Sequence, residues 1–317
     1  MKLGYIGLGK MGFAMAERLL EKDYQVVATN RSNESVDKIA QKGAIPAYEI
    51  SELVEKLDSK NNGENSQSSE SKTIWIMIPW KAVDDVLSEL VPLLRKGDTI
   101  IDGGNSPYLE TVRRSKEITE KGINFMDVGV SGGPNGARNG ACLMCGGNRK
   151  DFDKYEKLFK DLSVESGYGY MGLNGAGHFV KMVHNGIEYG MMQAIGEGFE
   201  VMKKINKDSE KGGFDLDLKE ISRVYNKGSV IESSLVGWLQ NAYQKNGEDL
   251  ENISGEVSHS GEGQWTVEAA DRLKVPVNII EQSLQFRKDS QGNPSYTGKV
   301  VSALRNEFGG HDVSNKK

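Results

Sequence analysis

A glycine-rich turn near the N-terminus restricts the fold of this chain more than any other feature. The apolar run 3–6 predicts a short buried strand, and the run 13–21 predicts an amphipathic helix. Between them lies G-x-G-x-x-G, made of Gly7, Leu8, Gly9, Lys10, Met11 and Gly12. Between a strand and a helix, these glycines permit a tight turn, close approach of a pyrophosphate to the backbone and close packing of helix on strand. Glycines also simply mark turns, but in this setting the segment indicates a dinucleotide site.

Strand and helix signals then alternate through the first half of the chain. Further strands are predicted at 25–29, 73–78, 99–101 and 125–128, and helices at 36–41, 50–57 and 83–94. This order predicts a Rossmann-type α/β domain with a doubly wound parallel sheet, in which ligands lie beyond the carboxyl ends of the strands. Two glycine-containing loops follow strands, DGGNS at 102–106 and VSGGP at 130–134. Together they predict a floor for nicotinamide and substrate.

The second predicted strand ends in Asn30, Arg31 and Ser32. An NAD-preferring site normally has an Asp or Glu about 20 residues after the glycine turn, which accepts a hydrogen bond from the ribose 2′-hydroxyl. Here an amide, a cation and a hydroxyl stand in that place, and they suit a 2′-phosphate. The trio favours NADP, with NAD as the alternative cofactor if Arg31 is only a solvated loop residue.

Composition excludes several classes of function. The net charge of −5 gives no reason to expect nucleic acid or a membrane surface as a partner. The apolar runs are too short to span a bilayer and no signal peptide is recognisable, so we expect a cytoplasmic protein. Cys142 and Cys145 form a C-x-x-C, but no second pair completes a zinc ribbon. On a strand they would face opposite sides, so they are interpreted as structural thiols.

The remaining segments predict the domain organisation. Residues 58–72 contain no apolar side chain, and we expect a mobile surface insertion there. After about residue 175 the pattern is helical, with helices predicted at 178–203, 219–226, 231–244, 264–273 and 277–287. The expected organisation is a dinucleotide-binding domain at 1–174, an all-α C-terminal domain at 175–290 and a C-terminal tail at 291–317.

The segment 175–190, GAGHFVKMVHNGIEYG, is where we expect the chemistry. Lys181, His184, Asn185 and Glu188 stand at i, i+3, i+4 and i+7, so that a helix projects all four from one face. The rest of the circumference is mainly apolar, which is typical of a buried helix. A polar row on such a helix must line a cleft or make buried hydrogen bonds. The alternative is an ordinary Lys/Glu pair on a solvated face.

Four segments together carry a resemblance to a known family. In order, GLGKMG, IDGGNS, GVSGGPNGARNG and GAGHFVKMVHNGIEYG resemble 6-phosphogluconate dehydrogenases of the decarboxylating type, and the similarity extends along essentially the whole chain. A length of 317 residues looks like the short form of that family. The loosely related 3-hydroxyisobutyrate-type dehydrogenases share the Lys and the Asn of the helix but not the HNGIEYG continuation.

The resemblance implies oxidative decarboxylation of 6-phosphogluconate to ribulose 5-phosphate and carbon dioxide, a step of the pentose phosphate pathway and of gluconate utilisation, without a metal ion. Lys181 would take the proton of the 3-hydroxyl as hydride leaves for the nicotinamide, and Glu188 would protonate C1 of the enediol. Asn185 and His184 would orient the 3-hydroxyl and the carboxylate. Burial beside a cationic ring would lower the pKa of the lysine from its usual value of about 10.4.

The resemblance also implies the substrate contacts and the assembly. Asn105 would lie near the nicotinamide, Ser131, Gly132 and Gly133 at the carboxylate, and Tyr189, Thr266 and Arg287 at the phosphate, with Gln264 replacing a family lysine. Arg305 and His311 have the spacing of a pair that reaches a neighbouring subunit in the family. The second domain would then serve substrate binding and dimerisation in a homodimer or homotetramer.

Two other functions stay open at this point. One is a β-hydroxyacid dehydrogenase that acts on a small unphosphorylated acid such as 3-hydroxyisobutyrate. The other is a non-catalytic NADP-binding protein that keeps only the fold. Arg287, Arg305 and Tyr189 argue against the first, since an unphosphorylated substrate needs no phosphate clamp. Lys181 and Glu188 argue against the second, because a sensor needs the glycine turn but not the polar row.

Overall fold

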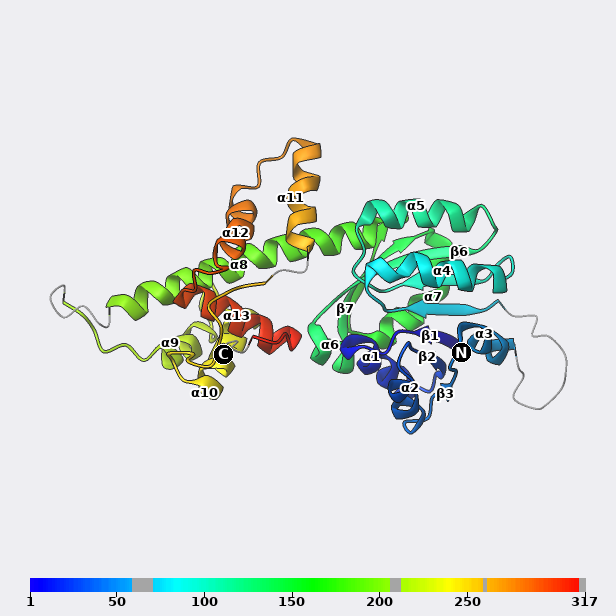
Figure 1. The fold of residues 1–317 in the computed structure, drawn as a ribbon, viewed down its shortest axis with the longest axis horizontal. Helices are drawn as coiled ribbons and strands as arrows, with labels where there is room; N and C mark the ends of the chain where they lie inside the picture. The colour runs from blue at the N-terminus through cyan, green and yellow to red at the C-terminus, as the bar shows by residue number, and fades with distance from the viewer. Residues whose placement is uncertain (59–70, 206–211, 259–260, 314–317) are drawn as a thin grey trace. The chain divides into compact units, whose positions relative to one another are not determined.

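The computed structural model describes residues 1–58, 71–205, 212–258 and 261–313 (Figure 1). The chain divides into two compact units, 1–182 and 183–317. The first is an α/β unit built on one sheet, and the second is helical. The expected Rossmann-type domain followed by an all-α region is therefore confirmed, with the division between the units inside a helix.

The first unit holds eight strands and the helices that connect them. The strands are β1 (Lys2–Ile6), β2 (Gln25–Thr29), β3 (Ile45–Pro46), β4 (Thr73–Ile76), β5 (Thr99–Asp102), β6 (Asn124–Ser131), β7 (Ala141–Gly147) and β8 (Ser163–Gly172). The helices are α1 (Lys10–Glu21), α2 (Asn33–Ala40), α3 (Ile50–Asp58), α4 (Val83–Leu90), α5 (Tyr108–Thr119), α6 (Gly133–Asn139) and α7 (Arg149–Leu162). Short 3₁₀ turns lie at Trp80–Ala82 and Val91–Leu93.

The sheet is mixed, so the expectation of a wholly parallel sheet is wrong. Its order is β3-β2-β1-β4-β5-β6-β7-β8, and the first six strands in this order are parallel. β7 runs antiparallel to β6, and β8 pairs parallel with β7. The reason is the short connection 132–140 between β6 and β7, because a parallel crossover needs about a dozen residues or more.

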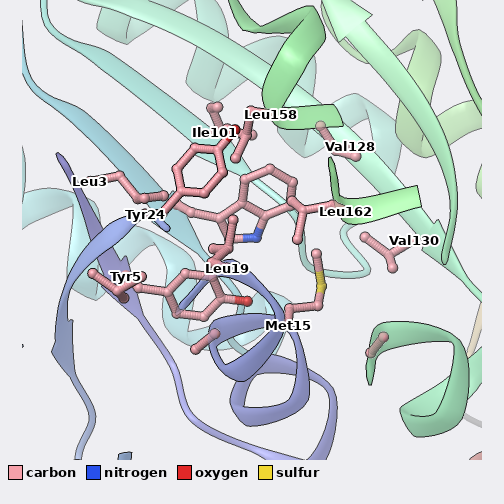
Figure 2. Close-up of a cluster of buried hydrophobic side chains, with 14 of the residues drawn as sticks. Leu3, Tyr5, Met15, Leu19, Tyr24, Ile101, Val128, Val130, Leu158 and Leu162 are labelled. Atoms are coloured by element: carbon pink, nitrogen blue, oxygen red, sulfur yellow. The ribbon is translucent and has the colours of Figure 1, made fainter. Parts of the chain in front are cut away.

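Both faces of the sheet carry an apolar core, as a doubly wound sheet requires. One face packs against α3, α4 and α5, and the other against α1, α2, α6 and α7. Figure 1 shows α4 and α5 on the opposite side of the sheet from α1 and α2. In Figure 2, Met15 and Leu19 of α1 lie beside Tyr5 of β1, with Leu162 of α7 nearby.

Several element boundaries differ from the sequence predictions. α1 begins at Lys10 instead of residue 13, so that Gly12 lies within its first turn. α4 ends at Leu90, before a 3₁₀ turn that contains Pro92. The region 129–175 yielded no sequence prediction of helices, yet it holds α6 and α7. The predicted limits 25–29 agree with both ends of β2.

The ends of the predicted insertion are part of the folded unit. Residues 59–70 lie outside the described part of the chain, but Asp58 closes α3 and Lys72 is buried. The Lys72 Nζ lies 2.9 Å from an Asp58 carboxylate oxygen and 3.8 Å from Asp98. The expected limits 58–72 therefore include an ion pair between buried Lys72 and partly exposed Asp58, which a count of apolar residues does not detect.

The second unit is built from helices. Helix α8 (Ala176–Ile205) contains the boundary between the units, and it is followed by α9 (Leu218–Tyr225), α10 (Ser234–Asn246), α11 (Glu262–Leu273), α12 (Asn278–Asp289) and α13 (Tyr296–Gly309). Most of the expected tail 291–317 is α13, and Val300, Val301 and Leu304 bury it in the core of this unit. Within the described ranges, no helix is long and apolar enough to cross a membrane.

Candidate active site

The glycine turn lies at the N-terminus of α1, at the carboxyl end of β1. Gly7 has a φ of +105°, which favours glycine, and its N–H donates to the Thr29 carbonyl at 3.0 Å. Gly9 is the N-cap of α1, and apart from the adjoining backbone no atom lies within 4 Å of the place where its Cβ would be. The first turn of α1 carries no acidic residue. An open backbone surface at a helix N-terminus fits the pyrophosphate of a dinucleotide.

The end of β2 lies beside this turn. The Asn30 side chain accepts a hydrogen bond from the Leu8 N–H at 3.0 Å, so it holds the turn in place. Arg31 and Ser32 are exposed, and Ser32 caps α2 without a side-chain hydrogen bond. The predicted trio therefore divides into one structural amide and two exposed groups. Of the other turn residues, Lys10 is exposed and Met11 partly buried.

The loop after β5 is held by its own aspartate. The buried Asp102 carboxylate accepts from the Gly104 N–H at 3.0 Å and from the Ser106 hydroxyl at 3.2 Å. A Cβ on Gly104 would lie 2.8 Å from the Ile78 carbonyl oxygen, so the loop packs tightly on the residues that follow β4. Asn105 is exposed at the tip of this loop.

Ser131 is the last residue of β6, and Gly132 and Gly133 lead directly into α6. The segment predicted as a loop at 130–134 is therefore the end of a strand and the start of a helix. Because β5 and β6 are adjacent and parallel, these residues and the loop 102–106 leave the same end of the sheet. Their use as a floor for nicotinamide and substrate stays a prediction.

Lys181 lies in the first unit, on the part of α8 that packs on β6. The residue is only 7% exposed. A Cβ on Gly129 of β6 would collide with the Lys181 Cβ, so the glycine allows the helix to approach the strand at this point. A buried amine beside a strand end is a candidate general base.

The sequence prediction missed a group of buried residues around the start of α8. The Asp127 carboxylate accepts from the Gly175 N–H at 2.7 Å and from the His178 N–H at 2.8 Å. The His178 Nδ1 lies 2.8 Å from the Thr111 hydroxyl of α5. The available signal was an acidic residue inside the apolar strand sequence FMDVGV, since a buried carboxylate requires partners.

In the second unit, α8 brings together the rest of the predicted polar row. The His184 Nδ1 lies 3.0 Å from the Asn185 side-chain oxygen and 3.8 Å from a Glu188 carboxylate oxygen. The helical spacing of the row is confirmed, because all four positions lie within α8. The expectation of an apolar helix surface buried all round is wrong in part, since Ile187 is 54% exposed.

A cationic cluster of two buried arginines, Arg287 and Arg305, lies in the second unit, and Glu188 and Glu262 are within electrostatic range of both. The Arg287 guanidinium lies 3.3 Å from the centre of the Tyr189 ring, and both residues are buried. Burial and the nearby charge of Arg305 lower the pKa of Arg287 to about 10, although Tyr189, Glu188 and Glu262 oppose the shift. Arg305 is buried too, and it donates to the Ser258 hydroxyl at 2.8 Å. Two buried guanidinium groups within electrostatic range of each other form a candidate site for a dianion.

Thr266, Gln264 and His311 have different surroundings. Thr266 is buried on α11, where Gly186 of α8 leaves room for it, and its hydroxyl donates to the Glu262 carbonyl at 3.0 Å. Gln264 is exposed and donates to Glu268 on the same helix at 2.9 Å. His311 is exposed beyond α13, and its ring packs edge-on against Phe308.

The two cysteines fit their structural interpretation. Cys142 is exposed and Cys145 is buried, both on β7 and both reduced. Positions three apart on this strand face opposite sides of the sheet, as predicted. Burial raises the pKa of the Cys145 thiol, which makes it a poor nucleophile.

An α/β unit that presents G-x-G-x-x-G at a helix N-terminus, followed by a helical unit with a buried lysine on the connecting helix, defines an NAD(P)-binding oxidoreductase. The chain matches the NAD-binding domain of 6-phosphogluconate dehydrogenase over residues 2–172, and the C-terminal domain of that enzyme over 177–211 and 204–316. It therefore belongs to the 6-phosphogluconate dehydrogenase family.

Individual relatives agree with this assignment. A Bacillus subtilis protein with the provisional name 6-phosphogluconate dehydrogenase YqeC is 44% identical over the full length of both chains. An NAD(+)-dependent, decarboxylating 6-phosphogluconate dehydrogenase of Haloferax volcanii is 39% identical over 100% of this chain and 99% of its own. The Plasmodium falciparum 6-phosphogluconate dehydrogenase structure is 29% identical with a TM-score of 0.74, over 92% of this chain and 62% of that one.

Proposed function

We propose that the protein catalyses the oxidative decarboxylation of 6-phosphogluconate to ribulose 5-phosphate and carbon dioxide, with NADP as the preferred cofactor. The observation that carries this proposal is the pair of buried guanidinium groups, Arg287 against Tyr189 and Arg305 nearby. Glu188 and Glu262 lie within electrostatic range of both guanidinium groups, but the Arg287 Nη2 has no hydrogen-bond partner among the described residues, and a phosphate oxygen would supply one. A small unphosphorylated acid needs no such clamp.

The chain's own residues take the following roles in this reaction. Lys181 accepts the proton of the 3-hydroxyl, and in its protonated form it polarises the ketone while the carboxylate leaves. Glu188 gives a proton to C1 of the enediol. His184 and Asn185, which contact each other, orient the 3-hydroxyl and the carboxylate. NAD(P), when bound, supplies the hydride acceptor. The burial of Lys181 supports its role as the general base.

The further substrate and cofactor contacts are proposed for residues that leave the same end of the sheet or belong to the cationic cluster. Asn105 contacts the nicotinamide and the substrate, and Ser131, Gly132 and Gly133 bind the substrate carboxylate. Tyr189, Thr266 and Arg287 bind the phosphate, with Arg305 and His311. Since the Gln264 side chain donates a hydrogen bond to Glu268, we assign Gln264 no phosphate contact.

The NADP preference rests on the end of β2. Asn30 is engaged with the glycine turn, while Arg31 and Ser32 are exposed there, and the first acidic residue after the strand is Glu34 within α2. A cation and a hydroxyl suit a 2′-phosphate. The NAD dependence named for the Haloferax volcanii relative makes NAD the alternative. We also propose a homodimer or a homotetramer, which light scattering coupled to gel filtration tests.

The test follows the absorbance of the reduced cofactor with 6-phosphogluconate and either NADP or NAD, while released carbon dioxide is trapped. We expect one carbon dioxide per reduced cofactor and a higher kcat/KM with NADP. An Arg31→Ala variant should lose most of the preference. Reduction without carbon dioxide, or turnover of 3-hydroxyisobutyrate in place of 6-phosphogluconate, would contradict the proposal. Cofactor binding with no turnover of either acid would indicate the non-catalytic alternative.

A further inference from the structure

The start of α8 is attached to one face of strand β6. Asn174 donates its side-chain amide to the Phe125 carbonyl at 2.5 Å. Two residues further along β6, the Asp127 carboxylate accepts from the N–H groups of Gly175 and His178, one bond to each oxygen. Two residues further again, Gly129 lies against the Lys181 Cβ. Every second residue of this part of β6 thus contacts the start of α8, up to Lys181.

Asp127 is the strongest of these attachments. It is fully buried, and its two bonds of 2.7 and 2.8 Å satisfy N–H groups that a helix N-terminus leaves without intrahelical partners. A carboxylate at this end also interacts favourably with the helix dipole. Burial raises the pKa of Asp127, whereas the two N–H bonds and His178 oppose the rise.

The packing around Asp127 leaves little freedom for the carboxylate. Gly146 of β7 is its partner across the strands, and a Cβ there would lie 2.6 Å from an Asp127 oxygen. Gly177 on the helix approaches the same strand so closely that a Cβ would lie 2.7 Å from the Asp127 carbonyl oxygen. The charged and titratable neighbours of Asp127 are His178 on α8, Asp102 on β5 and Cys145 on β7.

We propose that Asp127 is a positioning residue that holds the first turn of α8 on β6 and thereby sets the location of the Lys181 amine. Lys181 lies one turn beyond His178, so a movement of the first turn displaces its side chain directly. The inference rests on the proposed role of Lys181 as the base. Asp127 acts through the helix and does not touch the substrate.

The test is Asp127→Asn. An asparagine has one acceptor oxygen, so its NH₂ group would face one of the two N–H donors and one bond is lost. We expect kcat to fall between about 10- and 100-fold because the base is displaced. The dissociation constant of NADPH, measured by its fluorescence, should stay within about twofold, because the cofactor is bound at the glycine turn. The KM for 6-phosphogluconate should change less than kcat.

Asp98 provides a matched control at the opposite end of the sheet. It is also fully buried, and its carboxylate accepts from the N–H groups of Lys72 at 2.7 Å and Arg95 at 2.9 Å. Asp98→Asn removes the same kind of bond and should lower the melting temperature without a change in kcat. If kcat falls equally in both variants, the effect is general destabilisation and the proposal is wrong. The proposal is also wrong if Asp127→Asn folds and its kcat is unchanged.

Amide hydrogen exchange separates this inference from the proposed function. In Asp127→Asn, exchange in 175–182 should accelerate while exchange in 95–98 stays unchanged, whatever the substrate is. A wild-type protein that does not turn over 6-phosphogluconate would defeat the proposed function alone, and unaltered exchange in 175–182 would defeat the positioning role alone. If Asp127→Asn does not fold, Gly146→Ala, which displaces the carboxylate without removing it, takes its place with the same expected outcomes.

Discussion

At the scale of a single residue, the proposed phosphate site depends most on Arg287. It is 2% exposed and lies 3.3 Å from the centre of the Tyr189 ring, and its Nη2 has no hydrogen-bond partner among the described residues. A buried guanidinium donor without an acceptor carries a free-energy cost, which a bound phosphate oxygen removes. With a pKa of about 10, the group remains charged at neutral pH.

Arg287→Met should therefore weaken substrate binding specifically. Loss of a charge-assisted bond to a phosphate corresponds to about 1.5–3 kcal/mol, or about 10- to 150-fold in the KM for 6-phosphogluconate. Steady-state kinetics measure this change, and the dissociation constant of NADPH should not move. Arg272→Met, which changes an exposed arginine of α11, is the control. A KM that stays at the wild-type value would remove Arg287 from the phosphate site.

Lys181 and Glu188 are expected to act in different steps, and their variants should differ accordingly. Lys181→Met retains much of the side chain's length but has no nitrogen to accept a proton, so we expect no measurable cofactor reduction. Glu188→Gln should permit partial hydride transfer and slow the formation of ribulose 5-phosphate. Single-turnover measurement of cofactor reduction and of product separates the two steps. Full activity of Lys181→Met would refute the mechanism.

At the scale of the element, the loop after β5 depends on a helix that follows it. Arg114 of α5 is 1% exposed and pairs with Asp84 of α4 through two bonds of 2.9 and 2.8 Å. The same guanidinium donates to the Trp80 carbonyl at 3.1 Å and approaches the Ser106 hydroxyl at 3.4 Å. The arginine thus ties the segments that follow β4 and β5 to one helix.

Arg114→Met should loosen this loop, whereas Arg113→Met should not. Arg113 is the adjacent, more exposed arginine. It also pairs with Asp84, but its other hydrogen bonds go to Glu110 and Glu117 on its own helix. We expect the dissociation constant of NADPH to rise about tenfold in Arg114→Met, equal to about 1.4 kcal/mol, because the loop that carries Asn105 loses the contact of Ser106 with α5. Fluorescence titration measures it. Equal constants for the two variants would contradict the role of Arg114.

At the scale of the whole molecule, the C-terminal residues belong to the core of the second unit. α13 packs on α10, and Val300, Val301 and Leu304 are at most 1% exposed. Beyond the helix, the Ser254 N–H donates to the Val313 carbonyl at 2.8 Å. The chain end therefore contributes to the folding of this unit, in addition to any role of Arg305 in substrate binding.

Truncation after Lys299 should consequently unfold the second unit. Burial of each aliphatic side chain stabilises the fold by about 1.5–3 kcal/mol, and the free energy of unfolding of a typical domain is about 5–15 kcal/mol. The loss of three such side chains therefore removes a large part of the stability. Circular dichroism should record lower helix content and a lower melting temperature. Truncation after Val313 keeps the contacts described above and should melt like the full chain. A truncated chain that melts normally would show that α13 is dispensable.

The fold of the first unit follows largely from local sequence patterns. A doubly wound sheet is predicted by the glycine turn between a strand and a helix and by the alternation of strands and helices. Both signals are local, because apolar periodicity and glycine geometry act over a few residues. The helical spacing from Lys181 to Glu188 is equally local, and the resemblance of four short segments led to the correct family. These features need no knowledge of distant contacts.

The tertiary structure alone decided the remaining features, since each depends on residues far apart in the chain. The burial of Lys72 follows from its pairing with Asp58 and Asp98. The attachment of α8 to β6 joins residues about fifty positions apart, and its only sign in the sequence was a lone acidic residue in an apolar strand. Burial of a polar group can be stabilised only by a partner, and which partner is available is decided by the packing of the whole unit.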